Sequence, residues 1–110
     1  MQLAEQIAGR GMITTNHIRG EGWTWFCRKR WHRKAVEFLD ALETRSSHVA
    51  IEFVSQRLED EALHWLRQHD EREYSFVDAT SFAFMHARGI EEALAFDGDF
   101  AAAGFTELRP

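Results

Sequence analysis

Apolar positions recur every three or four residues in some segments of the chain and alternate in others. Helical spacing predicts helices from Met1 to Gly11, from Asn16 to about Arg30, over Ala35–Leu42, from Ser55 to about Gln68 and over Phe76–Arg88. Strand-like runs are His48–Val54, Met12–Thr15, Ala93–Phe96 and Phe105–Leu108. Strands that alternate with helices indicate an α/β domain with a mainly parallel sheet.

The segment Phe76–Arg88 differs from the other predicted helices because it is apolar nearly all round. Such a helix is buried on more than one side, so we expect it to pack against a sheet and, as one option, a partner subunit. Gly89 follows at the position where a helix often ends in a left-handed residue.

Composition limits the classes of protein that fit. The 110 residues, 45% of them hydrophobic, suit one domain with its own core. A net charge of −5 argues against a surface that binds nucleic acid throughout. The single cysteine, Cys27, has no internal disulfide partner, no run of about 18 apolar residues suits a membrane span, and no signal peptide is seen. We therefore expect a cytoplasmic protein.

Carboxylates stand at the ends of three predicted elements. Asp78 lies at the start of the apolar helix, Asp97 directly follows the run Ala93–Phe96, and Glu21 lies between two glycines early in another helix. Parallel strands bring such positions to one edge of a sheet, where the acids would repel one another without a cation. Ligation by oxygen suits Mg²⁺ or Mn²⁺ better than Zn²⁺. The alternative is that acids at helix starts simply favour the helix dipole.

The segment Arg28–Lys34, RKRWHRK, gathers five of the thirteen lysines and arginines. Basic side chains around an exposed aromatic suit contact with RNA phosphates and stacking on unpaired bases. A solvated helix end, where cations favour the dipole, is the alternative. The candidate RNA-binding residues are Arg28, Lys29, Arg30, Trp31, Arg33 and Lys34.

The stretch from Ser75 to Phe105 contains the following set of residues: Ser75, Phe76, Asp78, Ser81, Phe82, Gly89, Ala93, Leu94, Asp97, Phe100, Ala103, Gly104 and Phe105. With these residues the stretch resembles the C-terminal half of a PIN-domain protein of the VapC-type toxin group. The earlier run TTNHIRGEGW is similar to the family's Thr-Thr strand and the helix carrying its second acid, which falls on Glu21.

The resemblance implies a PIN-like three-layer sandwich, with a mainly parallel sheet flanked by helices. It implies a Mg²⁺- or Mn²⁺-dependent endoribonuclease, the toxin of a type II toxin–antitoxin pair, which hydrolyses RNA phosphodiester bonds. Glu21, Asp78 and Asp97 would be the catalytic and metal-binding acids, and Ser81 could support them. Asp99 either adds to the site or is a solvated turn acid. A cognate antitoxin and a homodimer are the implied partners, and we expect no membrane partner.

One family feature has no counterpart in these residues. The family opens with an apolar strand that ends in the first catalytic Asp, followed by a helix, and neither is found before Met12. We therefore expect residues 1–110 to form a single, incomplete, N-terminally truncated PIN-like domain whose sheet lacks its central strand. The alternative function is a catalytically weak or inactive remnant that binds an antitoxin or a sister subunit, and an RNA-binding module acting through Arg28–Lys34 is a third interpretation.

Overall fold

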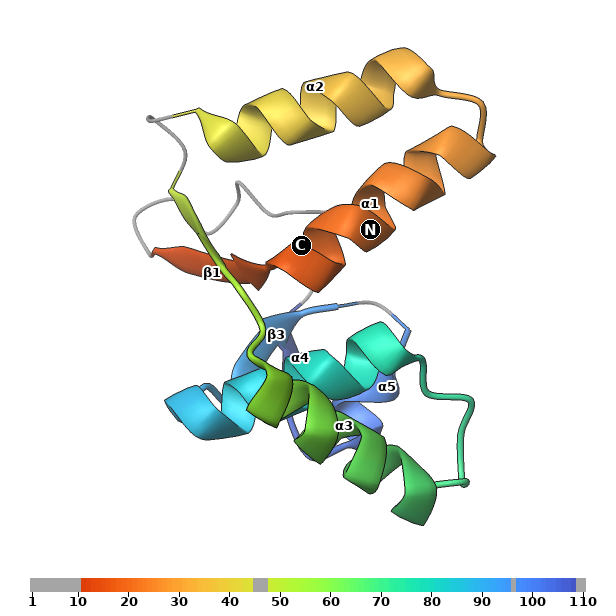
Figure 1. The fold of residues 1–110 in the computed structure, drawn as a ribbon, viewed down its shortest axis with the longest axis vertical. Helices are drawn as coiled ribbons and strands as arrows, with labels where there is room; N and C mark the ends of the chain where they lie inside the picture. The colour runs from red at the N-terminus through yellow and green to blue at the C-terminus, as the bar shows by residue number, and fades with distance from the viewer. Residues whose placement is uncertain (1–10, 45–47, 96, 109–110) are drawn as a thin grey trace. The chain divides into compact units, whose positions relative to one another are not determined.

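The computed structural model describes residues 11–44, 48–95 and 97–108 (Figure 1). The chain divides into two compact units, the first ending at Phe53 and the second beginning at Val54, and each is described by itself. The helix expected from Met1 to Gly11 lies outside the described residues apart from Gly11. The single domain over residues 1–110 stays a prediction.

The first unit is a pair of parallel strands connected through two helices. Its elements in chain order are β1 (Met12–Thr15), α1 (Asn16–Arg28), α2 (His32–Glu43) and β2 (Val49–Glu52). Met12 lies opposite Val49 and Thr15 opposite Glu52. Helices α1 and α2 pack on each other, and the Phe26 and Phe38 rings lie 5.5 Å apart between them. The predicted strands and helices of this unit are confirmed, although α2 begins three residues before Ala35.

The two ends of α1 are closed by different hydrogen bonds. Thr15, and not Asn16, is the N-cap, because its extended backbone places Oγ1 to accept a hydrogen bond from the Ile18 amide at 3.2 Å. At the other end the Arg30 amide donates to the Cys27 carbonyl and the Trp31 amide to the Phe26 carbonyl. This is a Schellman ending, in which Arg30 occupies the left-handed position with φ of 60° that glycine usually fills.

The second unit contains α3 (Gln56–Gln68), α4 (Phe76–Arg88), β3 (Glu92–Leu94), α5 (Asp99–Ala102) and β4 (Thr106–Leu108). Ser55 caps α3 by accepting from the Leu58 amide at 3.2 Å. Gly89 ends α4 with φ of 66°, as predicted. Strands β3 and β4 are parallel, with Glu92 opposite Thr106 and Leu94 opposite Leu108.

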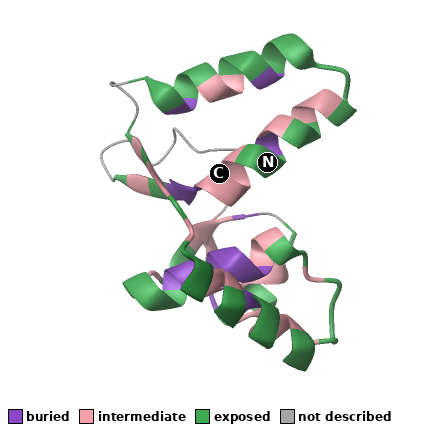
Figure 2. Cartoon of the chain, viewed as in Figure 1, coloured by how far each residue is buried: buried purple, intermediate pink, exposed green. Residues whose placement is uncertain are grey.

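Helix α4 is the centre of the second unit. Its stretch from Ala79 to Met85 is buried apart from the half-buried Ala83, which confirms the prediction made from its all-round apolar character (Figure 2). The core consists of Phe82, Met85 and Phe105, with Trp65 of α3 and Phe100 of α5 packed against it. The rings of Trp65, Tyr74, Phe100 and Phe105 all lie within 5.7 Å of the Phe82 ring, centroid to centroid.

The described strands form two separate parallel pairs, β1–β2 and β3–β4. Within the described residues no fifth strand pairs with either of these two-stranded sheets. Parallel strands joined through helices give the α/β class that the sequence predicted.

Candidate active site

Asp78 is held at the start of α4 by a reciprocal capping box. Its Oδ2 accepts from the Ser75 amide at 3.0 Å, and the Ser75 Oγ accepts from the Asp78 amide at 3.0 Å. The carboxyl is half-buried, and this burial raises its pKa above the usual range. The hydrogen bonds to Ser75 act in the opposite direction, while the charges of Asp99 and Asp97 raise the pKa further.

Asp97 lies in the turn between β3 and α5, three residues after β3 ends at Leu94. Its Oδ1 accepts from the Asp99 amide at 3.0 Å, which closes the turn through Gly98 at φ of 83°. The Asp99 carboxylate is only 17% exposed and accepts from Arg72 Nε at 2.9 Å. Asp99 is therefore in an ion pair through Oδ1, and its possible contribution to the site stays a prediction.

Ser81 is buried on the same face of α4 as Asp78. Its Oγ donates to the Val77 carbonyl at 3.0 Å, so the hydroxyl proton is used inside the helix. The oxygen keeps lone pairs with which it can still accept a hydrogen bond.

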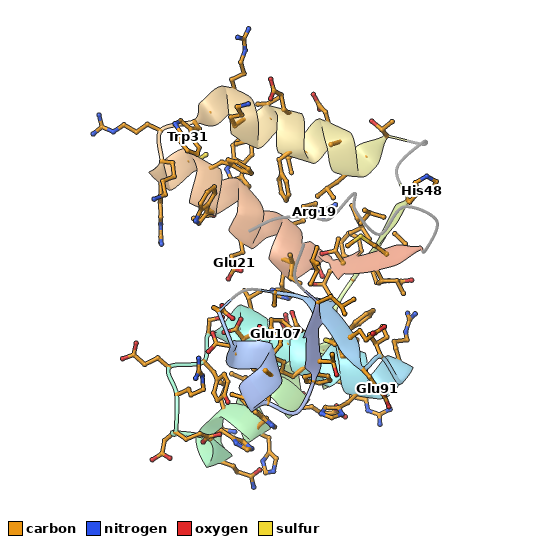
Figure 3. The ribbon with its side chains drawn as sticks, turned by 180° about the vertical axis from the view of Figure 1, so that it is seen from behind. Arg19, Glu21, Trp31, His48, Glu91 and Glu107 are labelled. Carbon is orange, nitrogen blue, oxygen red and sulfur yellow. The ribbon has the colours of Figure 1, made fainter. Side chains whose placement is uncertain are left out.

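Glu21 belongs to the first unit, where its side chain is exposed on α1 (Figure 3). A Cβ at the preceding Gly20 would meet nothing within 4 Å, so no described neighbour requires a glycine there. Among the residues that the structure describes, no three His, Cys, Asp or Glu side chains gather closely enough to hold a metal ion. The role of Glu21 as a third acid therefore remains a prediction.

Asp78 and Asp97 have the donor atoms that Mg²⁺ or Mn²⁺ needs. Each uses one carboxylate oxygen to accept a backbone amide, and within the described chain the other oxygen has no hydrogen-bond or ion-pair partner. The two charges also influence each other, since Asp97 raises the pKa of Asp78. A divalent cation would relieve that repulsion, so these residues fit a hard, oxygen-ligated ion.

The basic segment Arg28–Lys34 spans the end of α1, the turn and the first residues of α2. All its residues are exposed, Trp31 to 50% (Figure 3). Trp31 and Trp25 meet edge to face with ring centroids 6.1 Å apart, and Lys29 Nζ lies 5.7 Å from the Trp25 centroid. Tryptophan rings and cations thus share one exposed surface.

Sequence reasoning missed two residues near the second-unit acids. Arg72 lies in the connection 69–73, which the pattern marks only as charged, and its pairing with Asp99 spans 27 residues. The hydroxyl of Tyr74 is buried and has no hydrogen-bond partner among the described residues. No local signal identifies Arg72, because its contact depends on how the chain returns after β3, and the burial of Tyr74 depends on its packing against Trp65 of α3 and Phe82 of α4.

Three comparisons bear on this arrangement. The family model of the PIN domain matches residues 1–106. Two relatives from Mycobacterium tuberculosis, of strains CDC 1551 / Oshkosh and ATCC 25618 / H37Rv, are each a 23S rRNA-specific endonuclease VapC20. Both are 54% identical to this chain over 99 residues, which are 90% of this chain and 74% of the relative.

A solved structure agrees with them. The crystal structure of Mycobacterium tuberculosis VapC20, a sarcin–ricin loop cleaving toxin, matches with a TM-score of 0.85 and 50% sequence identity, over 96% of this chain and 80% of that one. The chain therefore belongs to the PIN-domain family, and within it to the VapC-type toxin group. In the described part of the chain, no helix is both long enough and apolar enough to span a bilayer.

Proposed function

We propose that this protein is a Mg²⁺- or Mn²⁺-dependent endoribonuclease, the toxin of a type II toxin–antitoxin pair, and that its substrate is 23S rRNA. The observation that carries the proposal is the 54% identity, over 90% of the chain, with a 23S rRNA-specific endonuclease. The half-buried acid Asp78 and the turn acid Asp97 add a physical reason, since their free oxygens fit a divalent ion.

The residues of the proposed site have different roles. Asp78 and Asp97 hold the ion, with Glu21 as the third acid and Ser81 as a hydrogen-bond acceptor beside Asp78. When bound, such an ion lowers the pKa of water and stabilises charge on a phosphoryl oxygen. The capping box fixes the Asp78 carboxylate, and the Asp99 amide fixes the Asp97 carboxylate, so each holds its direction before the ion arrives.

The basic segment is proposed to bind the RNA backbone. Arg33 and Lys34 lie in the first turn of α2, where the helix dipole disfavours cations, so a favourable dipole does not account for them. Arg30 stands at a left-handed position that favours glycine. Unfavourable placement of charge and backbone is typical of residues selected for binding. Arg28, Lys29 and Trp31 complete the proposed contact surface.

A cognate antitoxin and a second copy of the chain are the proposed protein partners, and the cytoplasm the proposed location. Exposed apolar side chains support an interface, since they are what a partner would cover: Phe53 is 69% exposed and Ile13 43%. The lone Cys27 is consistent with a reducing compartment.

The test is cleavage of a 23S rRNA fragment that contains the sarcin–ricin loop. We expect cleavage with Mg²⁺ or Mn²⁺, none with EDTA, and a loss of about 100-fold or more in Asp78→Asn and Asp97→Asn. Asp60→Asn, an exposed acid on α3 of the same unit, is the matched control and should cleave normally. Full cleavage by both Asp78→Asn and Asp97→Asn would refute the acid site.

A second outcome would favour the alternative function. If the protein forms a stable antitoxin complex yet cleaves no RNA with any divalent ion, it is a binding protein rather than a nuclease. Binding of RNA that falls steeply with salt but ignores EDTA would instead indicate an RNA-binding module.

A further inference from the structure

The guanidinium of Arg72 donates hydrogen bonds to two residues of the turn that carries Asp97. Arg72 Nε donates to Asp99 Oδ1 at 2.9 Å, and Arg72 Nη2 donates to the Asp97 carbonyl at 3.2 Å. The Asp99 amide in turn donates to Asp97 Oδ1 at 3.0 Å. The Asp97 residue is thereby fixed at its backbone by Arg72 and at its carboxylate by Asp99.

These contacts differ from an ordinary surface ion pair, which contributes little. The Arg72 side chain is 40% exposed, but the Asp99 side chain is only 17% exposed, and the planar guanidinium makes both bonds at once, which fixes direction as well as distance. Gly98 lies under the same group: a Cβ there would sit 3.6 Å from Arg72 Nη2, and its φ of 83° is one that other residues rarely adopt. The distance is an ordinary van der Waals contact, so it is the φ that favours glycine in the turn to which Arg72 donates.

The charges around the turn agree with this geometry. The Arg72 guanidinium, which is always positively charged, faces the carboxylate of Asp99 and the backbone carbonyl of Asp97. Its ion pair is made to Asp99, and within the described chain the Asp97 and Asp78 carboxylates make no ion pair and keep one oxygen without a hydrogen-bond partner.

We propose that Arg72 is a positioning residue for the reaction: it orders the turn 97–99 so that the Asp97 carboxylate points where a divalent ion is bound, with Asp99 as its anchor. This inference rests on the proposed function and assigns roles in that same site. It makes Asp99 part of the support for Asp97 and not a metal ligand.

The main test compares Arg72→Gln with Arg57→Gln. Arg57 is the matched control because it also donates through Nε to a carboxylate, Glu61 Oε1 at 3.3 Å, on the exposed surface of α3. We expect Arg72→Gln to lower kcat by roughly 10- to 100-fold, the scale of a small misplacement of a reacting group, with KM for RNA unchanged. Arg57→Gln should leave both constants unchanged. Arg72→Lys keeps the charge but not both bonds, and should recover only part of kcat.

The affinity for Mn²⁺ distinguishes the loss of order in the turn 97–99 from the loss of the Arg72 charge. Removing a positive charge beside Asp97 would by itself tighten Mn²⁺ binding, whereas loss of order weakens it. We expect Arg72→Gln to bind Mn²⁺ more weakly in calorimetry and its Asp99 amide to exchange hydrogen faster than in the parent protein. Tighter Mn²⁺ binding, or unchanged exchange, would overturn the proposal. If Arg72→Gln does not fold, the same measurements on Arg72→Lys decide the question.

A double variant tests whether the pair acts as one unit. Asp99→Ala combined with Arg72→Gln should lower kcat no further than Arg72→Gln alone, because both remove the same interaction. Additive losses would contradict the anchoring role. Asp97→Asn distinguishes failure of the proposed active site from failure of the proposed role of Arg72. If Asp97→Asn cleaves RNA fully, the proposed site itself is wrong. If Asp97→Asn is inactive but Arg72→Gln cleaves as well as Arg57→Gln, only the role of Arg72 is wrong.

Discussion

Arg30 offers a substitution whose effects on stability and on RNA binding have opposite signs. Its φ of 60° lies in the left-handed region, at the end of α1 where the Schellman hydrogen bonds close. Its side chain is exposed, so shortening it removes little packing. We compare Arg30→Gly with Arg30→Ala, because both remove the charge and only glycine removes the backbone strain.

The expected size follows from the backbone. A left-handed conformation costs a residue with a Cβ roughly 1–2 kcal/mol. Glycine avoids that cost but loses roughly 0.5–1 kcal/mol more through backbone entropy on folding. Arg30→Gly should therefore exceed Arg30→Ala in free energy of unfolding by about 0.5–1 kcal/mol, or about 2–6 °C in Tm.

RNA binding supplies the second measurement. In an Asp78→Asn background, which should bind RNA without cutting it, both Arg30 variants should bind equally weakly. The slope of log affinity against log salt should fall by about 0.7–0.9, which corresponds to one lost phosphate contact. Arg67→Ala, an exposed arginine of α3 outside the basic segment, is the control. Equal stability of the two Arg30 variants would refute the strain argument, and an unchanged salt slope would remove Arg30 from the RNA surface.

Three further predictions concern the second unit. Burial, with the charges of Asp99 and Asp97, raises the pKa of Asp78 above its unfolded value, so ionisation opposes folding. In EDTA, the parent protein should therefore lose stability relative to Asp78→Asn as pH rises from the ordinary Asp range through the raised pKa. The measurement is urea unfolding of both proteins across this pH range, and a difference in free energy of unfolding that does not change with pH would contradict the prediction. Phe82→Ala empties the centre of the aromatic core and should cost about 3–5 kcal/mol in urea unfolding, and a loss below about 1 kcal/mol would mean that the core collapses around the cavity. Gly98→Ala places a Cβ at φ of 83° and should lower the free energy of unfolding by about 1–2 kcal/mol and also lower the cleavage rate. Gly20→Ala is the control, because a Cβ there meets nothing within 4 Å, and it should not destabilise the protein.

Much of the local structure could be predicted because it depends on short-range patterns. The apolar run of α4 and the left-handed Gly89 were predicted and are confirmed, and the Ser75 cap is encoded just as locally. The ends of α1 were less predictable. Thr15 and Asn16 are both good capping residues, and which one caps depends on where β1 stops.

Sequence alone determined the α/β class, the PIN-domain membership and the candidate acids Glu21, Asp78 and Asp97. Only the tertiary structure decided what surrounds two of those acids. It half-buries Asp78, and it brings Arg72 across 27 residues to pair with Asp99 and hold the Asp97 turn. The reason is physical: helical and strand periods are local, but desolvation of a carboxylate and pairing of charges distant in sequence arise only when separate elements pack.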